Sequence, residues 1–464
     1  MITIITRELM ENLKDFRFAL LLIFSLILFL LNGMIFPEKY ISSKKGFDAS
    51  INRTYFNPNL TSIEIFQKPS PFNFMAEGGD VYRSRHWDVR HFGSIRPRVN
   101  SPNRDDRLPD IPEPDWVFII KIVFSLYIIL MGYNAISGEK EQGTLALTLS
   151  NPITRIKLLL AKYCALMITV FVPLLYGLVL NIIIVSNSVP EIVSHTSSVQ
   201  LIMMFLVICV YLSVFAFLSL LFSSLIKQSS MSLLFLMVFW IIFTISGDIA
   251  GIVSGKIAHI PSEMDIAEQH KYFDFTEYYD EFRRKVERDD FSSKEELLHE
   301  GKQLFISLQK NTNKHIDDYT QSILQRKKMT RFLSKFSPMT LFQNTAECVA
   351  GTGLKNEEKF INNALSYAII YDSYVKEKLG ELPVAFDYIG GKFTVDYDGE
   401  KVLVESPRRQ QYDVDLDDFP VFQESKISLR SIVRDSFIDL SGLLFWNIGL
   451  AISLLTAFLR VDVR

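Results

Sequence analysis

The chain has 464 residues, of which 48% are hydrophobic and 22% are charged, and its formal net charge is -3 at pH 7. This charged fraction excludes a protein that lies wholly inside a membrane, and alternating apolar spans and soluble segments fit better. The near-neutral balance gives no reason to expect a nucleic-acid partner. The three cysteines form no CxxC or Cys/His cluster, so we expect neither a disulfide framework nor a zinc site.

The first segment, residues 1–17, has the pattern of an amphipathic helix. One helical face is charged and the opposite face carries Ile2, Ile5, Leu9, Leu13 and Phe16. Such a helix would lie flat in the cytoplasmic interface of a membrane.

Six segments are apolar over about 20 residues, the length that crosses the hydrocarbon core as a helix. They cover roughly residues 18–36, 116–137, 164–186, 200–224, 231–254 and 438–459. The first is not followed by a small-residue cleavage site, so we interpret it as a retained helix rather than a signal peptide. The predicted fold class is therefore a mainly α membrane protein with six transmembrane helices.

The basic residues of the short connections favour one orientation. Arg7, Lys14 and Arg17 precede the first span, and Lys227 lies in the turn between the fourth and fifth spans. The turn after the third span has no Lys or Arg. Because short cytoplasmic loops are enriched in these residues, both termini are predicted to be cytoplasmic. The expected location is a bacterial inner membrane.

The same orientation places two long polar stretches, 37–115 and 255–437, outside the cell. The first is rich in proline and reads as irregular or short-stranded. The second begins with a helical pattern, and its segment Val384–Val404 alternates between turn signals as a hairpin does. A helix with a glycine stop is predicted from Ser337 to Gly351. We expect both stretches to form one extracytoplasmic α+β domain.

The stretch 138–162, between the second and third predicted spans, is too polar to sit in lipid and should protrude into the cytoplasm. Glu139 and Glu141 stand near the start of a short predicted helix, where carboxylates interact favourably with the helix dipole. Pro152 is expected to end that helix because it has no backbone N–H.

This helix is predicted to dock into a groove of a partner protein. Gly143 has no Cβ and would allow close backbone approach, and Glu139 would offer a charge to a basic groove. Leu145, with Leu147 and Leu149, would supply the apolar contact. The alternative interpretation is a loop that lies on lipid headgroups.

The stretch also resembles the cytoplasmic coupling segment of ABC-2 type transporter permeases. The shared pattern is Glu139, Gly143, Thr144, Leu145, Ser150, Pro152, Ile153, Arg155 and Lys162. The residues around 337–353 are similar to a stretch in the subgroup with large extracytoplasmic insertions. The resemblance implies that 138–162 couples the spans to a separate ABC ATPase subunit, present in two copies, and that a second permease copy or a homologous permease completes the transporter.

The chain itself has no G-x-x-x-x-G-K-[ST] phosphate-binding motif. We therefore expect it not to be an enzyme and to bind no cofactor directly, with Mg-ATP held by the partner ATPase. No metal site is expected, because the spacing of His86 and His91 suits neither a helix face nor one side of a strand.

Two polar residues near the outer ends of the spans are candidates for a transport pathway, namely Asn181 and Asp248. The leading hypothesis is a permease that exports or extracts a hydrophobic, lipid-like or lipoprotein cargo. A second is a mechanotransmission or scaffold protein that moves its outer domain against a periplasmic partner. A membrane-embedded enzyme acting on membrane lipid ranks last, because clustered acids or histidines are missing from the sequence.

Overall fold

The computed structural model describes most of the helical part of the chain. The described residues are 2–56, 62–78, 86–90, 94–97, 114–150, 153–193, 195–257, 324–379, 392–397, 400–405, 418–424 and 428–460, with short pieces between 284 and 322. Pro152 and His91 lie outside them, as does much of the predicted helical pattern at 297–324.

Among the described residues, six helical segments are long and apolar enough to cross a membrane, the number that the sequence predicted. They are α2 (Phe16–Phe56), a composite span that begins at Trp116, α7 (Arg155–Ser188), α8 (His195–Leu225), α9 (Ser229–Ile257) and α16 (Leu429–Leu459). The composite span consists of α3 (Trp116–Phe118), the π-helical turn η2 (Ile119–Phe124), α4 (Ser125–Gly132) and α5 (Ser137–Glu141).

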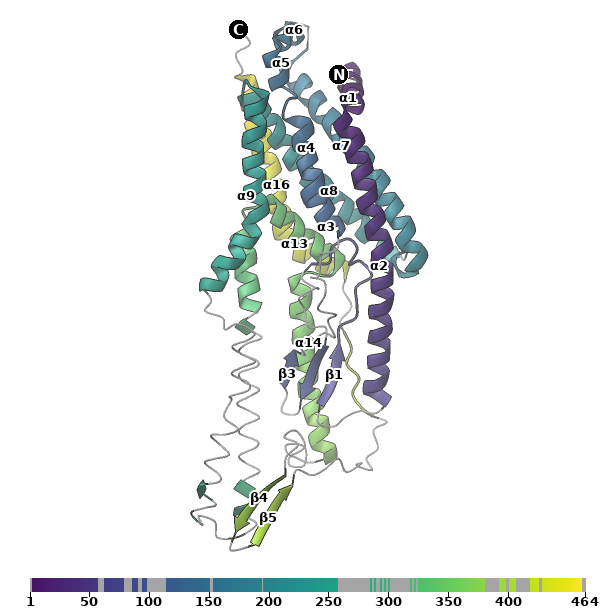
Figure 1. Cartoon of the computed structure of the whole chain (residues 1–464), viewed down its shortest axis with the longest axis vertical. Coiled ribbons are helices and arrows are strands. Elements are labelled where there is room, and N and C mark those ends of the chain that lie inside the picture. The colour runs from purple at the N-terminus through teal and green to yellow at the C-terminus, as the bar shows by residue number, and fades with distance from the viewer. Residues whose placement is uncertain are drawn as a thin grey trace.

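The remaining described helices lie at the two ends of this bundle. At the end that carries both termini are α1 (Ile2–Lys14) and α6 (Thr144–Ser150) (Figure 1). Toward the other end are η3 (Pro190–Val193), α13 (Pro338–Ala350) and α14 (Leu354–Leu379).

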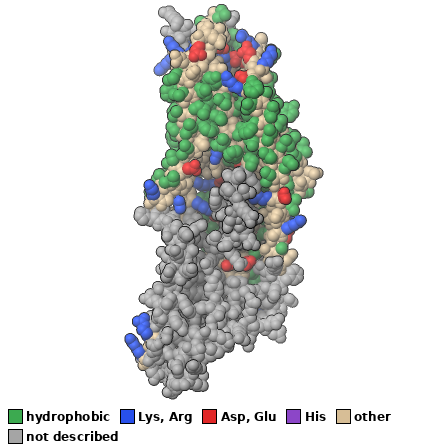
Figure 2. All heavy atoms as spheres, viewed as in Figure 1, with side chains coloured by type: hydrophobic (Ala, Val, Ile, Leu, Met, Phe, Trp, Pro, Cys, Tyr) green, Lys and Arg blue, Asp and Glu red, His purple; other side chains and the backbone are tan. Residues whose placement is uncertain are grey.

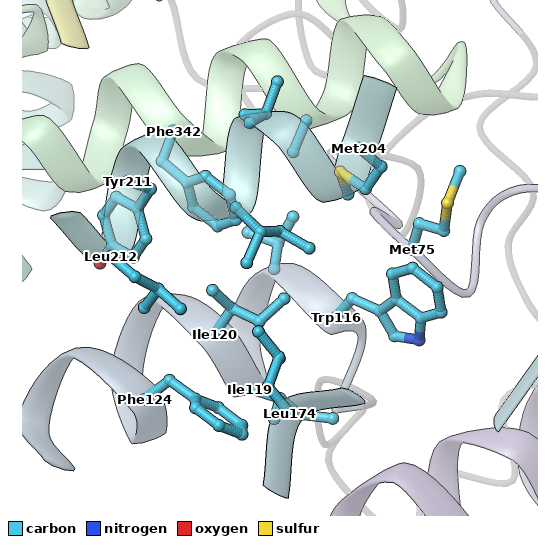
Figure 3. Close-up of a cluster of buried hydrophobic side chains, with 14 of the residues drawn as sticks. Met75, Trp116, Ile119, Ile120, Phe124, Leu174, Met204, Tyr211, Leu212 and Phe342 are labelled. Carbon is cyan, nitrogen blue, oxygen red and sulfur yellow. The ribbon is translucent and has the colours of Figure 1, made fainter. Parts of the chain in front are cut away.

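Hydrophobic side chains cover the bundle in a broad band, and charged side chains lie beyond both of its margins (Figure 2). Inside the bundle, the spans meet in one large core. Tyr211 of α8 stacks on Phe342 of α13 with ring centroids 4.2 Å apart, and Trp116, Ile120 and Phe124 lie nearby (Figure 3). Aromatic stacking and apolar burial of this kind hold the helices together where lipid provides no hydrophobic driving force.

Helix α2 extends well beyond the predicted end of the first span at residue 36. It continues through Pro37 to Phe56, so the first part of the predicted loop 37–115 is helical. Tertiary contacts stabilise this extension: Lys39 forms an ion pair with Glu77 at 2.6 Å, and the Tyr40 hydroxyl donates to Glu191 at 2.5 Å. The prediction of an irregular segment directly after residue 36 was wrong, because the proline does not break a helix held by its neighbours.

Helix α13 confirms the predicted helix between Ser337 and the glycine stop. Gly351 has a φ of 78°, the left-handed conformation that suits glycine after a helix. The helix is buried along almost all its length and packs against α8, α9 and α16. It therefore belongs to the bundle, although the sequence assigned it to the outer domain.

The described parts of the two long stretches share a second core. An antiparallel sheet in the order β1-β2-β3 is formed by Ser62–Phe66, His86–Arg90 and Ser94–Pro97. Its inward side chains, among them Ile65 and Trp87, pack against α14 through Phe360 and Tyr371. A separate hairpin pairs β4 (Lys392–Tyr397) with β5 (Glu400–Glu405) and extends one residue beyond the segment Val384–Val404 that was predicted to form one. Whether one α+β domain includes all these elements stays a prediction.

Candidate functional site

The predicted coupling segment forms a helical hairpin at the end of the bundle that carries both termini (Figure 1). Helices α5 and α6 are joined at Gln142 and Gly143, and α7 begins at Arg155, inside the predicted segment 138–162. Glu139 lies in the first turn of α5, whereas Glu141 is its last residue. The segment is thus two short helices followed by the first turns of a span.

Gly143 makes the turn between the two helices. Its φ is 69°, a conformation that costs a residue with a Cβ roughly 1–2 kcal/mol. A Cβ at this position would meet no atom within 4 Å, so the glycine is not needed to make room for another part of this chain. The hydroxyl of Thr144 donates to the Glu139 carbonyl at 3.3 Å across the turn.

A buried lysine connects three elements behind the hairpin. The Nζ atom of Lys162 on α7 lies 2.7 Å from a carboxylate oxygen of Glu8 on α1 and 2.7 Å from one of Glu139 on α5. The Lys162 side chain is only 2% exposed. An ammonium group removed from water needs such charged partners, so the three side chains act as one unit. Sequence reasoning found Lys162 only through the family resemblance and assigned Glu8 no partner.

Glu141 and Lys140 attach the end of α5 to the turn between α8 and α9. The Glu141 carboxylate accepts hydrogen bonds from the backbone N–H and the hydroxyl of Ser229, both at 2.8 Å. Ser229 is the first residue of α9, so this carboxylate satisfies a free N–H at a helix N-terminus and interacts with its dipole. Lys140 donates to the carbonyl of Ser224 at the end of α8.

Leu145 lies on the inner side of α6, and the prediction that it would be the exposed apolar contact was wrong. It is 3% exposed and packs in a cluster with Ile136, Leu158, Leu159, Leu220, Leu454 and Phe458. Leu147, two residues further on, is 71% exposed. Alternate leucines on a short helix point to different sides, and the sequence could not tell which side faces the bundle.

Arg155 connects the start of α7 to the end of α16. Its guanidinium donates to the carbonyl oxygens of Leu459 at 2.9 Å and Phe458 at 3.4 Å. A cation at a helix C-terminus satisfies free carbonyl groups and interacts favourably with the dipole. The α5–α6 hairpin and the residues that follow it thus contact the middle of α1 and the ends of α8, α9 and α16.

The structure does not bring the two candidate pathway residues together. Asn181 on α7 is buried, donates to Phe29 and Asn32 of α2, and accepts from the Trp116 indole at 2.9 Å. Asp248 is exposed on the outer half of α9. Asn181 therefore holds α2, α3 and α7 together in this structure, and a pathway role for either residue stays a prediction.

Lys121 makes a polar contact inside the bundle. Its ammonium donates to the side-chain amide oxygen of Gln343 of α13 at 2.9 Å. Gln343 in turn donates to Glu347, which pairs with Arg331 at 2.6 Å. This chain of polar contacts joins the composite span to α13 and to the helical stretch that precedes it.

A family model described as an ABC-2 family transporter protein matches residues 2–370, which include the hairpin, the first five spans and α13. No curated protein matches the chain. The chain therefore belongs to the ABC-2 family of transporter proteins, as the resemblance in its coupling segment predicted.

Proposed function

We propose that this chain is the membrane-spanning permease subunit of an ABC transporter and that a separate ATPase docks on the α5–α6 hairpin. One observation supports this most strongly. The hairpin exposes Leu147 on one side, while its other side is fixed to the bundle through Leu145, Glu139 and Glu141. A hairpin that exposes an apolar side chain on one side and is held to the bundle on the other can both bind a partner and pass on its movement.

Movement of α6 would reach the spans through short polar contacts. A displacement of α5 would act on α7 and α1 through Lys162 and on α9 through Ser229. Packed elements of this kind respond as bodies rather than deforming continuously. ATP binding and hydrolysis in the partner would in this way tilt the spans, with Mg-ATP bound by the partner alone.

We further propose that two such permease halves, identical or homologous, face each other above two ATPase subunits in a bacterial inner membrane, with both termini of each half in the cytoplasm. A lipid-like or lipoprotein cargo that is exported or extracted suits a chain whose outer residues we propose to form an α+β domain. The coupling role extends to Thr144, Pro152 and Arg155.

A second candidate function is mechanotransmission without cargo, with the outer part acting on a periplasmic partner. The continuous helix α2 favours it, because its 41 residues run from the bundle to the outer sheet and could carry movement there. Reconstituted vesicles distinguish the two functions. ATP-dependent loss of a labelled lipid or lipoprotein from the membrane supports the permease, whereas movement of the outer part alone supports mechanotransmission.

We predict that the purified chain does not hydrolyse ATP and that an ABC ATPase copurifies with it from mild detergent. The sequence lacks a phosphate-binding motif, so we expect no ATP turnover by the chain itself. The exposed hairpin offers a surface on which the ATPase can dock. The measurement is ATP turnover of the chain before and after a wash that removes bound subunits. Turnover that persists in the washed chain, or recovery of the chain without any ATPase, contradicts the proposal.

We predict that residue 150 is cytoplasmic and that residues 84 and 292 lie outside the cell. The variants Ser84→Cys, Ser292→Cys and Ser150→Cys, made without Cys164 and Cys209, each carry one new cysteine beside Cys348 and are treated from outside with an impermeant thiol reagent. Burial raises the pKa of the remaining Cys348 thiol to about 11, so it should stay unlabelled. Labelling at 150, or its absence at 84 and 292, would reverse the topology.

A further inference from the structure

We propose that the outer end of α9, together with the helical stretch 324–336 packed beside it, forms a binding surface for the anionic headgroups of the outer leaflet. Helix α9 has 29 residues and is about 43 Å long, whereas a hydrocarbon core is about 30 Å thick. Its first residue is held at the cytoplasmic turn by Glu141. The last turns of α9 must therefore reach the depth of the outer headgroups.

The stretch 324–336 runs antiparallel to this end of α9. Phe336 contacts Phe243 with ring centroids 6.3 Å apart, and further out the hydroxyls of Thr330 and Ser254 lie 2.5 Å apart. Phe336 also contacts Trp446 of α16. The stretch thus begins outside the hydrocarbon and ends within its outer margin.

Apart from the exposed carboxylate of Asp248, the exposed side of this helix pair carries large apolar side chains at headgroup depth. Phe332 lies in the last turn of the helical part and Phe336 in the turn that follows it, and they are 71% and 67% exposed. On the outer turns of α9 the exposed apolar residues are Ile249, Ile252, Val253 and Ile257. They continue the surface that the same helix exposes to lipid within the hydrocarbon core. Lipid is therefore the partner that this outer surface is expected to contact.

The same stretch carries five basic residues and no acid: Arg326, Lys327, Lys328, Arg331 and Lys335. Three of them pair with carboxylates of neighbouring helices, because Lys327 contacts Glu357, Lys328 contacts Glu358 and Arg331 contacts Glu347. Arg326 and Lys335 remain, together with Lys256 at the end of α9. Within the described ranges, no ion pair joins these three to an acid, although Asp439 lies within electrostatic range of Lys335.

Three basic groups beside exposed phenylalanines match the chemistry of an anionic phospholipid at the interface. The aromatic rings would enter the acyl region while the cations meet phosphate groups. Lys and Arg side chains gather at the lower margin of the hydrophobic band in Figure 2, where this headgroup layer would lie. Long basic side chains near the end of a span reach such groups readily.

The test uses the full chain in vesicles, with its native cysteines replaced and a fluorophore attached at Phe332→Cys. A brominated lipid quenches the fluorophore only when it is in contact. Brominated phosphatidylglycerol in phosphatidylcholine should quench about two- to fivefold more than brominated phosphatidylcholine at the same mole fraction. The combined variant Lys256→Gln, Arg326→Gln and Lys335→Gln should lose this preference.

Two controls keep the test decisive. The variant Lys45→Gln, which removes an exposed charge from the outer part of α2, should keep the preference, and a fluorophore at exposed Ile183 of α7 should show none. Equal quenching by both lipids at position 332 overturns the proposal. So does the absence of quenching by either lipid, which would mean that protein, such as a second copy of this chain, covers the surface.

Discussion

Replacing Lys162 with methionine is expected to destabilise the chain by roughly 3 kcal/mol and to uncouple the ATPase from the spans. The substitution leaves the carboxylates of Glu8 and Glu139 side by side without the ammonium that binds both at 2.7 Å. This loss of stability lies at the lower end of the range for broken buried ion pairs, because both carboxylates keep partial contact with solvent. The measurements are the thermal stability of the purified chain and the ATPase activity of the complex relative to the free ATPase.

Matched variants separate stability from coupling. Lys162→Arg keeps the charge and should behave much like the unaltered chain, and Lys157→Met removes an exposed charge of the same helix with little effect. The triple variant Glu8→Gln, Glu139→Gln and Lys162→Met removes all three charges and should recover most of the stability. It should not recover coupling, because the charged contacts between α1, α5 and α7 are gone. Normal coupling in the triple variant would show that this ion-pair unit has only a structural role.

The membrane part of the fold was predictable because long apolar segments leave few alternatives. Both the number of spans and the helix that stops at Gly351 followed from local signals, namely hydropathy, a Ser-Pro start and a glycine. The continuation of α2 through Pro37 was not predictable, because it depends on contacts with Glu77 and Glu191, which are distant in the sequence.

At the coupling site, too, local features were predictable and contacts between distant residues were not. The polar, helical character of the segment followed from its own residues. One short helix was predicted, however, whereas the structure has two, α5 and α6, with Gly143 at the turn between them. The Lys162 unit was missed because Glu8 lies 154 residues earlier, on a helix whose charged face was expected to meet water. The burial of Leu145 was missed because its neighbours in the cluster come from α7, α8 and α16. Local patterns predict elements, whereas the side of an element that faces the core depends on the assembled bundle.

Replacing Leu147 with aspartate is expected to reduce recovery of the ATPase with the chain at least about tenfold, while the chain itself inserts and folds normally. Leu147 is exposed in the isolated chain, so the charge costs little there, but it would be desolvated without a partner in an apolar contact. A loss of about 1.4 kcal/mol in binding already corresponds to tenfold. The measurement is the amount of copurified ATPase at equal membrane levels of the permease.

Leu145→Asp provides the contrast, because the same substitution two residues earlier places a carboxylate inside the chain's own cluster. It should lower the amount of folded chain rather than only its association with the ATPase. Ser150→Asp, on an exposed residue of the same helix, controls for added charge. If α6 instead lies on lipid headgroups, Leu147→Asp and Ser150→Asp should leave ATPase recovery equally unchanged. Leu147→Asp tests the outer side of α6, and Leu145→Asp tests its inner side. Together the two substitutions identify the docking surface independently of the family assignment.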